Sequence, residues 1–257
     1  MESGESGGRN WFESLLGILG SILTLVKEGK RKAEEVVRLL EIIVQRVDFY
    51  SFLTASRSAS VNTDTPADGW AAEWSRFYQQ VFGITVDLSS VRVADDPGGF
   101  GWVVFVAKEL TYNRVYAMCR GLFASSSFYG DDLDSVINKE ERTADKGPYA
   151  VRFRNRVESD EENINTSANT LAERQTQNIT LLEAMLMELW YFWRTGGSHL
   201  NFVRWVLCAG SRYLDGNIPC VARDDDEFHV SSCCPSNASD SLSSRSAVHL
   251  TLHTPAL

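Results

Sequence analysis

ITLLEAMLMELWYFWRTGG, residues 179–197, contains the strongest structural signal in this 257-residue chain. Thr180 and Glu183 have the spacing of a capping box, in which each side chain bonds the backbone N–H of the other residue at a helix start. Gly196 supplies the left-handed conformation at which many helices end. Because apolar residues fill almost every position between these ends, the stretch predicts a helix buried on most of its surface.

Three shorter elements are predicted ahead of this helix. Residues 67–83 predict a helix that begins at Asp68 and ends at Gly83. The run Trp102–Val106 is continuous, apolar and rich in β-preferring residues, which indicates a buried strand. Residues 111–123 have the period of an amphipathic helix. Its core-facing side chains are expected to be Val115, Met118, Cys119 and Leu122.

Residues 149–157 alternate between apolar and basic side chains, which predicts a half-exposed strand. The apolar side carries Tyr149, Val151 and Phe153, and the basic side carries Arg152, Arg154 and Arg156. The acidic sequence ESDEEN follows directly, so we expect the arginines to lie in solvent and to pair with these carboxylates. Binding of an anion by the arginine row is the alternative.

The chain after Phe202 consists of short β-like pieces separated by turns. These pieces lie at residues 202–208, 210–223, 227–232 and 244–252. Turns are predicted at Asp215-Gly216, Pro219 and Pro235. Elements in this order predict an α+β domain whose last strands return to pair with its first.

The N-terminal 50 residues form a separate region in this interpretation. Residues 11–26 and 33–47 both have the apolar period of amphipathic helices, and Gly29 lies between them. Residues 51–66 are rich in Ser, Thr and Asp, as is typical of a linker, so the main domain is placed at residues 67–257. Self-association through the two N-terminal helices is a further expectation for this region.

The sequence predicts neither a membrane span nor an export signal. The apolar run at residues 11–26 is shorter than the roughly 20 residues that a spanning helix needs. Glu2 and Glu5 stand where a secretory signal would have basic residues. A cytoplasmic protein is the default, with membrane association as the less favoured alternative. The net charge of −9 disfavours nucleic acid as a partner, because phosphates are bound through clustered Lys and Arg.

Motifs for catalysis or metal binding are weak. The five cysteines are odd in number and have no regular spacing, which disfavours a disulfide scaffold. A zinc site would have to draw on Cys220, His229, Cys233, Cys234 and His249. No C-x-x-C spacing occurs among them, and adjacent Cys233 and Cys234 point to opposite sides of a strand. Residues 224–227 lack the ligand spacing of a calcium loop, and Ser211 in CAGSR lacks the pattern of a nucleophile elbow. We therefore expect no enzyme activity, metal or cofactor.

The composition changes abruptly in the C-terminal part of the chain. Lys, Gln, Met, Trp and Glu occur 39 times in residues 1–205 but only once, as Glu227, in residues 206–257. No codon for these five residue types ends in a pyrimidine. The residue types that remain include Asp, Ser, Cys, His and Asn. These types are obtained when the two adenines of an asparagine codon are randomised and its final pyrimidine is kept. A disordered tail would instead be rich in Lys, Glu and Gln and poor in Cys, Val and Phe.

Residues 145–219, from DKGPYAV to DGNIP, and LSSRSAV at 242–248 resemble a widespread, uncharacterised bacterial family. Its members share the stretches around VESDEE, SAN, ITLLE and CAGSR, and then differ strongly until a final R-x-A-V. The family is similar to the variable proteins of diversity-generating retroelements, in which an error-prone reverse transcriptase rewrites adenine positions. The resemblance covers roughly residues 70–248 and implies a C-type-lectin-like fold with two main helices, short antiparallel strands and an irregular C-terminal part. This chain departs from the family at Arg223 and Ser231–Ser232, near which tryptophans are common.

The resemblance implies a hypervariable, non-catalytic binding protein that displays side chains from residues 206–248 on a fixed scaffold. The expected partner is a protein or another surface ligand. The contact residues are expected to be Tyr213, Cys220, Asp224, Asp225, Phe228, His229, Ser231, Ser232, Cys233, Cys234, Asn237, Ser239, Asp240 and Ser241. Two alternatives stay open: a small hydrolase or metal-binding enzyme that uses Cys and His groups of this region, and a structural or regulatory protein that acts through its N-terminal helices.

Most of these contact side chains are expected to face solvent and to form one contiguous patch. Phe228 is expected to be the least exposed, because the apolar side of the alternating sequence EFHVSS should face the core. Leu242 and Val248 are expected to anchor the end of the segment. Arg212 and Arg245 are assigned to the scaffold, where their charges would hold the loop ends against the acidic body of the domain.

Overall fold

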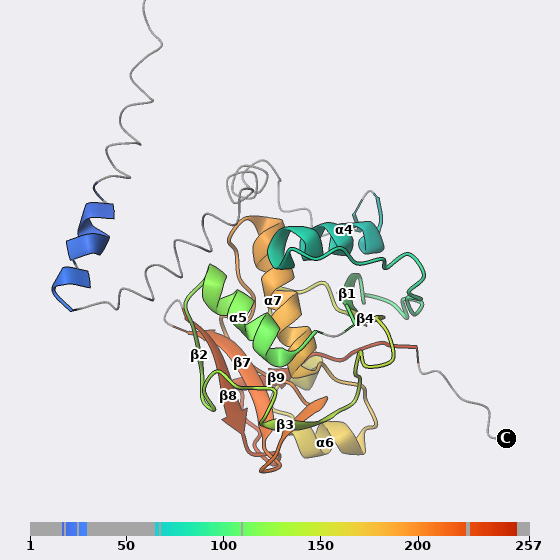
Figure 1. Ribbon diagram of the computed structural model, residues 1–257. Helices are drawn as coiled ribbons and strands as arrows, with labels where there is room; N and C mark the ends of the chain where they lie inside the picture. Colours follow the sequence, from blue (N-terminus) through green and yellow to red (C-terminus); the bar gives the residue numbers. More distant parts are fainter. Residues whose placement is uncertain are drawn as a thin grey trace, which may run out of the picture. The chain divides into compact units, whose positions relative to one another are not determined.

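Helix α7, Leu181–Thr195, forms the centre of the domain, as its apolar sequence predicts (Figure 1). Both halves of the capping box are present. The Thr180 hydroxyl accepts from the Glu183 N–H, and the Glu183 carboxylate accepts from the Thr180 N–H. Gly196 ends the helix with a φ of 72°. Every residue from 181 to 191 is buried, which confirms the prediction of a helix covered on most sides.

The computed structural model describes residues 17, 19–24, 26–29, 65–66, 68–108, 110–224 and 227–250. The chain divides into two units, residues 1–50 and 51–257. In the first unit, the described residues between 17 and 27 are helical, and Gly29 follows with a φ of 70°. The predicted helix at 33–47 and nearly all of the predicted linker at 51–66 lie outside the described residues. No helix in the described part of the chain has the length and apolarity needed to cross a membrane.

Helix α4, Trp70–Phe77, continues as a π-helical turn, η1, Tyr78–Phe82, and ends at Gly83 as predicted. Asp68 does not cap the helix start, contrary to the prediction. Its carboxylate pairs instead with the guanidinium of Arg76, two turns further along. The Asp68 carboxylate is therefore used on the helix surface, and the helix start has no side-chain cap.

Aromatic rings join α4 to α7. Trp70 and Trp74 of α4 contact Trp190 of α7, with ring centroids 5.7 and 5.9 Å apart. The Trp190 indole N–H donates to Glu73 at 2.8 Å, and the Trp74 indole N–H donates to the Val103 carbonyl at 2.6 Å. Each of these two buried indoles thus has a partner for its polar edge, which lets the rings pack in the core without losing a hydrogen bond.

Strand β1, Trp102–Val106, is buried at every residue, as predicted, and pairs antiparallel with β4, Tyr149–Phe153. The prediction of a half-exposed strand with a basic side is wrong for β4, because both of its faces are covered. Arg152 lies on the side expected to be solvated, yet its guanidinium donates to the carbonyls of Ala94 and Phe100. The basic residue in the alternating pattern of β4 therefore has a structural role, because the Arg152 guanidinium holds the loop that contains Ala94 and Phe100 against the strand.

The two arginines that follow β4 pair with the acids as predicted, but both are partly buried and do not lie fully in solvent as expected. Arg154 pairs with Asp160 at 2.5 Å, and Arg156 pairs with Glu162 at 2.8 Å. Both acids belong to the ESDEEN stretch, and Glu162 lies in the 3-10 turn η2, Glu161–Asn163. These local carboxylates neutralise the two arginines, which argues against an anion site on this row.

Helix α5, Tyr112–Leu122, packs against α7 and is capped by the Thr111 hydroxyl. Val115 and Cys119 are fully buried, as predicted. The other two side chains expected to face inward, Met118 and Leu122, are partly buried and lie at the edge of the core.

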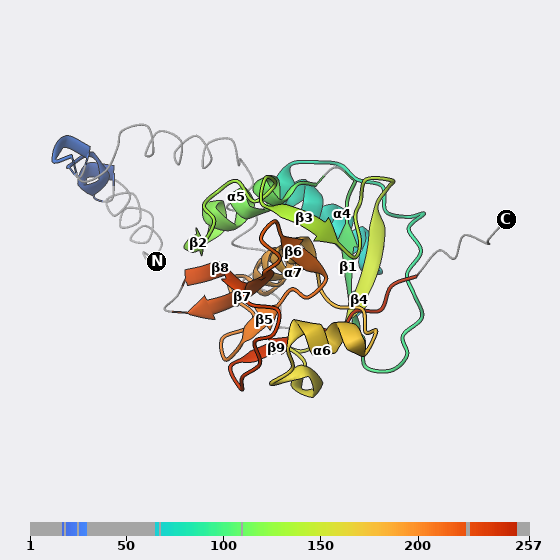
Figure 2. The same ribbon diagram turned by 90° about the horizontal axis from the view of Figure 1, so that it is seen from below.

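A five-stranded sheet packs against α7 through its strand β7 and against α5 through its strand β2 (Figure 2). Its strands, in sheet order, are β2 (Ser125–Ser127), β8 (Glu227–Cys233), β7 (Ile218–Asp224), β5 (Trp205–Leu207) and β9 (Leu242–Ser244). β7 is antiparallel to both of its neighbours, whereas the β2–β8 and β5–β9 pairs are parallel. The two short strands β3 (Ile137–Glu140) and β6 (Ser211–Tyr213) pair separately.

The five-stranded sheet has two faces with different coverings. One face, the core face, joins the main hydrophobic core through Val206, Val221, Phe228 and Val230. The opposite face, the outer face, carries a smaller cluster made of Leu207, Ile218, Cys220 and Cys233. Helix α6, Ala168–Glu173, covers part of this cluster with Ala168 and Leu171. Alternate residues of each strand thus belong to different cores, as the pleat of a strand requires.

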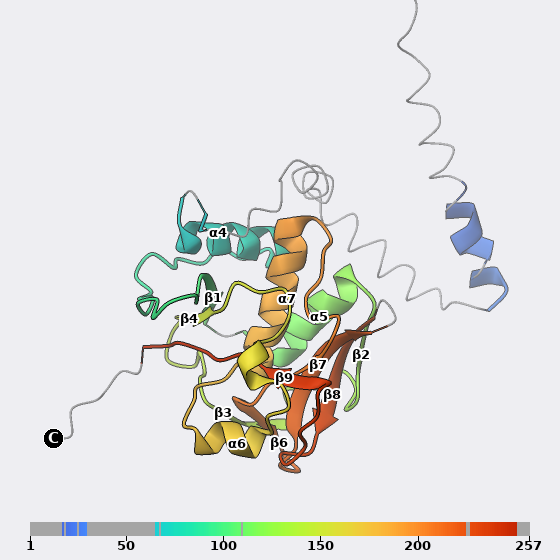
Figure 3. The same cartoon turned by 180° about the vertical axis from the view of Figure 1, so that it is seen from behind.

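The last strand differs from the prediction. Residues 244–252 were expected to form it, but β9 comprises only Leu242–Ser244, and residues 246 and 248 make isolated bridges to Asn178 and Arg152. The chain thus returns to β4, the partner of β1, in keeping with the expected return of the C-terminal end to the early strands (Figure 3). The described domain has the α+β architecture that its element order predicts.

Candidate ligand-binding surface

The expected contact residues lie on β6, β7, β8 and the loop at residues 234–241. The exposed members are Asp224, Cys234, Asn237, Asp240 and Ser241. The partly buried members are His229, Ser231, Ser232 and Ser239. The buried members are Tyr213, Cys220, Phe228 and Cys233. Asp225 lies outside the described residues.

Tyr213 is buried, which corrects its assignment to a solvent-facing patch, whereas the burial of Phe228 confirms that it faces the core and removes it from the contact set. Each is 1% exposed, so Phe228 shares the lowest exposure of the set with Tyr213. The Tyr213 ring lies 4.4 Å from that of Tyr129, and its hydroxyl donates to the Ser231 carbonyl. Phe228 faces the main core, where its ring meets that of Phe123. Neither side chain can contact a ligand without displacing these partners.

Cys220 and Cys233 are also excluded from the solvent-facing group. Both belong to the outer-face cluster beneath α6. Burial raises the pKa of the Cys220 thiol to about 12, so it stays protonated at neutral pH. The neighbouring Cys234, which follows the end of β8, is exposed.

The outer face is open where β8 passes Trp205. The His229 Nδ1 atom lies 2.8 Å from the Ser126 hydroxyl of β2, and the His229 ring lies 6.0 Å from the Trp205 ring. Ser231 lies two residues further along β8, on the same face. These four partly buried side chains, Ser126, Trp205, His229 and Ser231, form what we call the outer-face group. The sequence analysis did not identify Ser126 and Trp205 as contact residues. Both lie outside residues 206–248, and neither has a distinguishing local pattern.

The loop at residues 234–241 ends beside this group. The Trp205 N–H donates to the Ser241 carbonyl at 2.9 Å, and the Arg204 guanidinium donates to the Asp240 carbonyl at 3.0 Å. Within the loop, the Ser239 and Ser241 hydroxyls are 2.8 Å apart. The loop and the outer-face group therefore meet at Trp205. This surface is smaller than the single patch expected. Four of the expected contact residues are buried, and Ser232 faces the other side of the sheet, near Tyr129.

The contacts of His229 differ from those of a serine-hydrolase triad. No three His, Cys, Asp or Glu residues are grouped as a metal site would need in the described part of the chain. Ser126 contacts His229 through Nδ1, and Glu227 lies 3.7 Å from Nε2. In serine hydrolases the nucleophile contacts Nε2 and the acid contacts Nδ1, the reverse of this arrangement.

The CAGSR motif has a structural role at the start of α7. The Gly210 N–H donates to the Ile179 carbonyl, and a Cβ atom on Gly210 would lie 2.7 Å from the Asn178 carbonyl oxygen. The Ser211 hydroxyl accepts from the Leu181 N–H at 2.9 Å and donates to Glu140. Ser211 is completely buried by these contacts. Its hydroxyl is thus engaged by the scaffold.

The LSSRSAV motif, which we call the closing peptide, is buried in the scaffold at residues 243–245 and at Ala247. The Arg245 side chain is 1% exposed and donates to the carbonyls of Arg156 and Val157 and to the Asn201 amide oxygen. This confirms Arg245 as a scaffold residue, although it binds carbonyl groups where pairing with acids was expected. Arg212 similarly donates to the Ala209 carbonyl.

The two expected apolar anchors are only partly buried. Leu242 packs at the edge of the outer-face cluster, and Val248 is held by its backbone bridge to Arg152.

Comparisons with known protein families, curated proteins and solved structures find no match to this chain.

Proposed function

We propose that this protein is a hypervariable, non-catalytic binding protein, built on a C-type-lectin-like domain and diversified at adenine positions by a retroelement. Its contact surface consists of the outer-face group and the loop at residues 234–241. The observation that carries the proposal is the placement of the pyrimidine-codon segment between two buried motifs. Ser211 and Arg245, 0% and 1% exposed, flank a stretch whose exposed side chains make few scaffold contacts.

The lectin-like assignment rests on the resemblance and is supported by the arrangement of elements. Two helices, α5 and α7, pack against short and mostly antiparallel strands, and the last described residues return to an early strand. Fold alone would not assign a function, because one scaffold can present many surfaces. The argument for binding therefore depends on the side chains displayed.

These side chains suit a polar macromolecular ligand. Asn237, Asp240 and Ser241 offer exposed hydrogen-bonding groups, and Trp205 offers an aromatic surface beside them. Binding loops of antibodies combine the same two features, adaptable small polar residues and a rigid aromatic anchor. We accordingly propose a protein surface as the ligand class.

The proposal is tested with two libraries in the full-length chain. The first randomises His229, Ser231, Asn237, Ser239, Asp240 and Ser241 with codons that end in a pyrimidine. The matched library applies the same codons to buried residues of the same region, namely Tyr213, Cys220, Phe228, Val230, Ser243 and Ser244. We expect most members of the first library, and few of the second, to give soluble protein with cooperative thermal unfolding.

Selection on a fixed protein target should then yield binders from the first library. Failure of most of its members to fold, or equal tolerance in both libraries, would contradict the proposal. An independent genomic check is a near-repeat of the DNA for residues 206–248 that differs at adenines, next to a reverse-transcriptase gene.

A further inference from the structure

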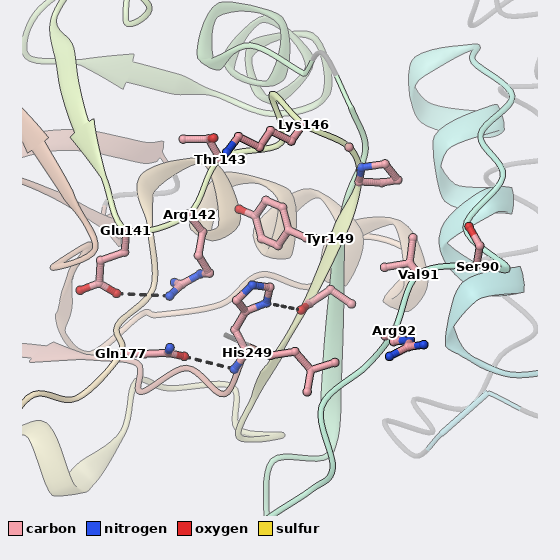
Figure 4. A pocket seen from close by; sticks show the side chains of 14 residues that line it. Ser90, Val91, Arg92, Glu141, Arg142, Thr143, Lys146, Tyr149, Gln177 and His249 are labelled. Carbon is pink, nitrogen blue, oxygen red and sulfur yellow. Dashed lines mark hydrogen bonds and ion pairs between the residues drawn. The ribbon is translucent and has the colours of Figure 1, made fainter. Parts of the chain in front are cut away.

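A cavity of about 730 Å³ lies where residues 90–92, the segment 141–150, Gln177 and the last described residues, 249–250, come together (Figure 4). Its volume is in the range typical of small-molecule sites. None of the expected contact residues lines it, so it is separate from the surface proposed above.

The floor of the cavity is rigid. Arg142 is 7% exposed, and its guanidinium makes two bonds to the Glu183 carboxylate, Nε to Oε1 at 2.7 Å and Nη2 to Oε2 at 2.8 Å. The Tyr149 hydroxyl donates to Glu183 at 3.0 Å. Because Glu183 belongs to the capping box of α7, these side chains are fixed to the most buried helix of the domain. The Arg142 charge is neutralised there, and this residue serves as part of the wall.

His249 is held in one orientation above this floor. Its Nδ1–H donates to the Ala150 carbonyl at 2.9 Å, and its backbone N–H donates to the Gln177 side chain at 3.2 Å. Its ring meets the Tyr149 ring edge-on at 5.5 Å. Since a carbonyl oxygen can only accept, the Nδ1 atom carries the proton of this hydrogen bond.

The charge of the lining is opposite to that of the chain. Arg92 and Lys146 are exposed cations on the cavity rim, and neither has an ion-pair partner among the described residues. Glu141 is the acidic residue of the lining, and its carboxylate is engaged by the Asn178 N–H and by Arg142. The three cations Arg92, Arg142 and Lys146 face the two acids Glu141 and Glu183, so one net positive charge remains at this cavity in a chain of net charge −9. Such a site attracts small anions over a distance.

We infer that this cavity binds a small organic anion, a carboxylate or a phosphate ester. The rim cations Arg92 and Lys146 attract the acidic group into the cavity, and the organic body lies against Pro148, the His249 ring and Leu250. The mixture of apolar walls and a few convergent polar groups is that of a typical ligand pocket. An arginine and a lysine are the side chains best suited to carboxylate and phosphate oxygens.

The test uses isothermal titration of the full-length chain at low ionic strength with three probes of similar size. Phenylacetate and phenyl phosphate carry the two acidic groups, and 2-phenylethanol is their neutral counterpart. The charge-reversal variants are Arg92→Glu and Lys146→Glu. Arg114→Glu is the matched control, because Arg114 is an exposed arginine of α5 that does not line the cavity.

We expect at least one acidic probe to bind with a dissociation constant of about 1 mM or lower, and each rim variant to weaken it about tenfold. The control should bind like the wild type, and the better acidic probe identifies the head group. Equal binding of 2-phenylethanol, absence of binding of both acids up to about 10 mM, or equal effects of the rim variants and the control would each overturn the inference. Because binding to a protein target is measured separately, failure here leaves the proposed function untouched.

Discussion

Side-chain hydrogen bonds hold the start of α7 in place, whereas backbone hydrogen bonds hold the strand β8. At α7, side chains make the contacts: Arg142 and Tyr149 bond Glu183, and Ser211 bonds the Leu181 N–H. At β8, the backbone makes them, through parallel pairing with β2 on one side and antiparallel pairing with β7 on the other. The contrast predicts that substitutions at the start of α7 destabilise the domain, whereas substitutions at the outer-face residues of β8, such as His229 and Ser231, are tolerated.

The largest effect is expected when the buried ion pair is broken. Arg142→Met leaves the Glu183 carboxylate, 0% exposed, without its cation, and we expect the free energy of unfolding to fall by about 3–5 kcal/mol. Chemical denaturation at pH 7 measures this loss. The matched control is Arg156→Met, which removes a more exposed pair and should cost about 1 kcal/mol or less. Similar losses in both variants would remove the distinction between the two kinds of pair.

The same pair predicts a dependence on acid. Burial alone would raise the pKa of Glu183, but the Arg142 charge and hydrogen bonds lower it below its ordinary value. A lowered pKa contributes stability that is fully present above the unfolded value of about 4.3 and is lost as the pH falls through the folded value. The wild type should therefore lose stability more steeply than Arg142→Met below about pH 4. Parallel unfolding curves against pH would contradict this.

A smaller loss is expected at the contact between the CAGSR motif and α7. A Cβ atom in Gly210→Ala would lie 2.7 Å from the Asn178 carbonyl oxygen and 3.0 Å from Thr180, so backbone must shift. We expect a loss of about 1–3 kcal/mol in unfolding free energy. Gly121→Ala in α5 is the control, because nothing lies within 4 Å of its added Cβ. There the change should be neutral or stabilising.

The capping box comes next in size. Thr180→Ala removes the hydroxyl that accepts from the Glu183 N–H and should cost about 1 kcal/mol. Thr180→Ser keeps that hydroxyl and should restore most of the stability. Binding of a selected protein target should be the same in all three proteins. A loss of binding by Thr180→Ala at unchanged thermal stability would place this helix in the contact surface.

The smallest effect is expected on the contact surface. Alanine at His229, Ser231, Asn237 and Asp240 together should change the free energy of unfolding by no more than about 0.5 kcal/mol per site. The inward neighbours provide the comparison, since Phe228→Ala alone should cost about 3–5 kcal/mol. Thermal unfolding of the two variants measures the difference directly. A cooperative loss in the outward variant would show that these side chains support the sheet.

The sequence predicts the elements whose signals are local. The capping box and glycine stop of α7 and the buried run of β1 formed at their predicted positions, since both depend on residues within one element. The burial of Tyr213 and Cys220 could not be predicted. Tyr213 is covered by Tyr129 and Cys220 by the α6 cluster, and both coverings come from distant parts of the chain.

The same limit applies to Arg152, whose partners lie 52 and 58 residues earlier in the chain. Its alternation with apolar residues has the same form whether the guanidinium meets water or two buried carbonyls. The cavity at His249 is likewise assembled from segments that carry no common motif. The tertiary fold brings these distant segments together. A single sequence does not show which residues will lie next to Arg152 or His249.

The closing peptide makes the stability of the domain depend on a short segment near its C-terminal end. Arg245 reaches carbonyl groups at residues 156 and 157, and the Ser243 hydroxyl donates to the carbonyl of Asp160, so the domain is completed only by its final segment. A frameshift or premature stop introduced anywhere in residues 206–241 would remove that segment and leave these buried acceptors without donors. Each buried acceptor left unpaired in this way should cost about 1–3 kcal/mol in the free energy of unfolding. The stability of the whole domain therefore depends on a few donors at residues 243–245, which lie near the end of the described chain.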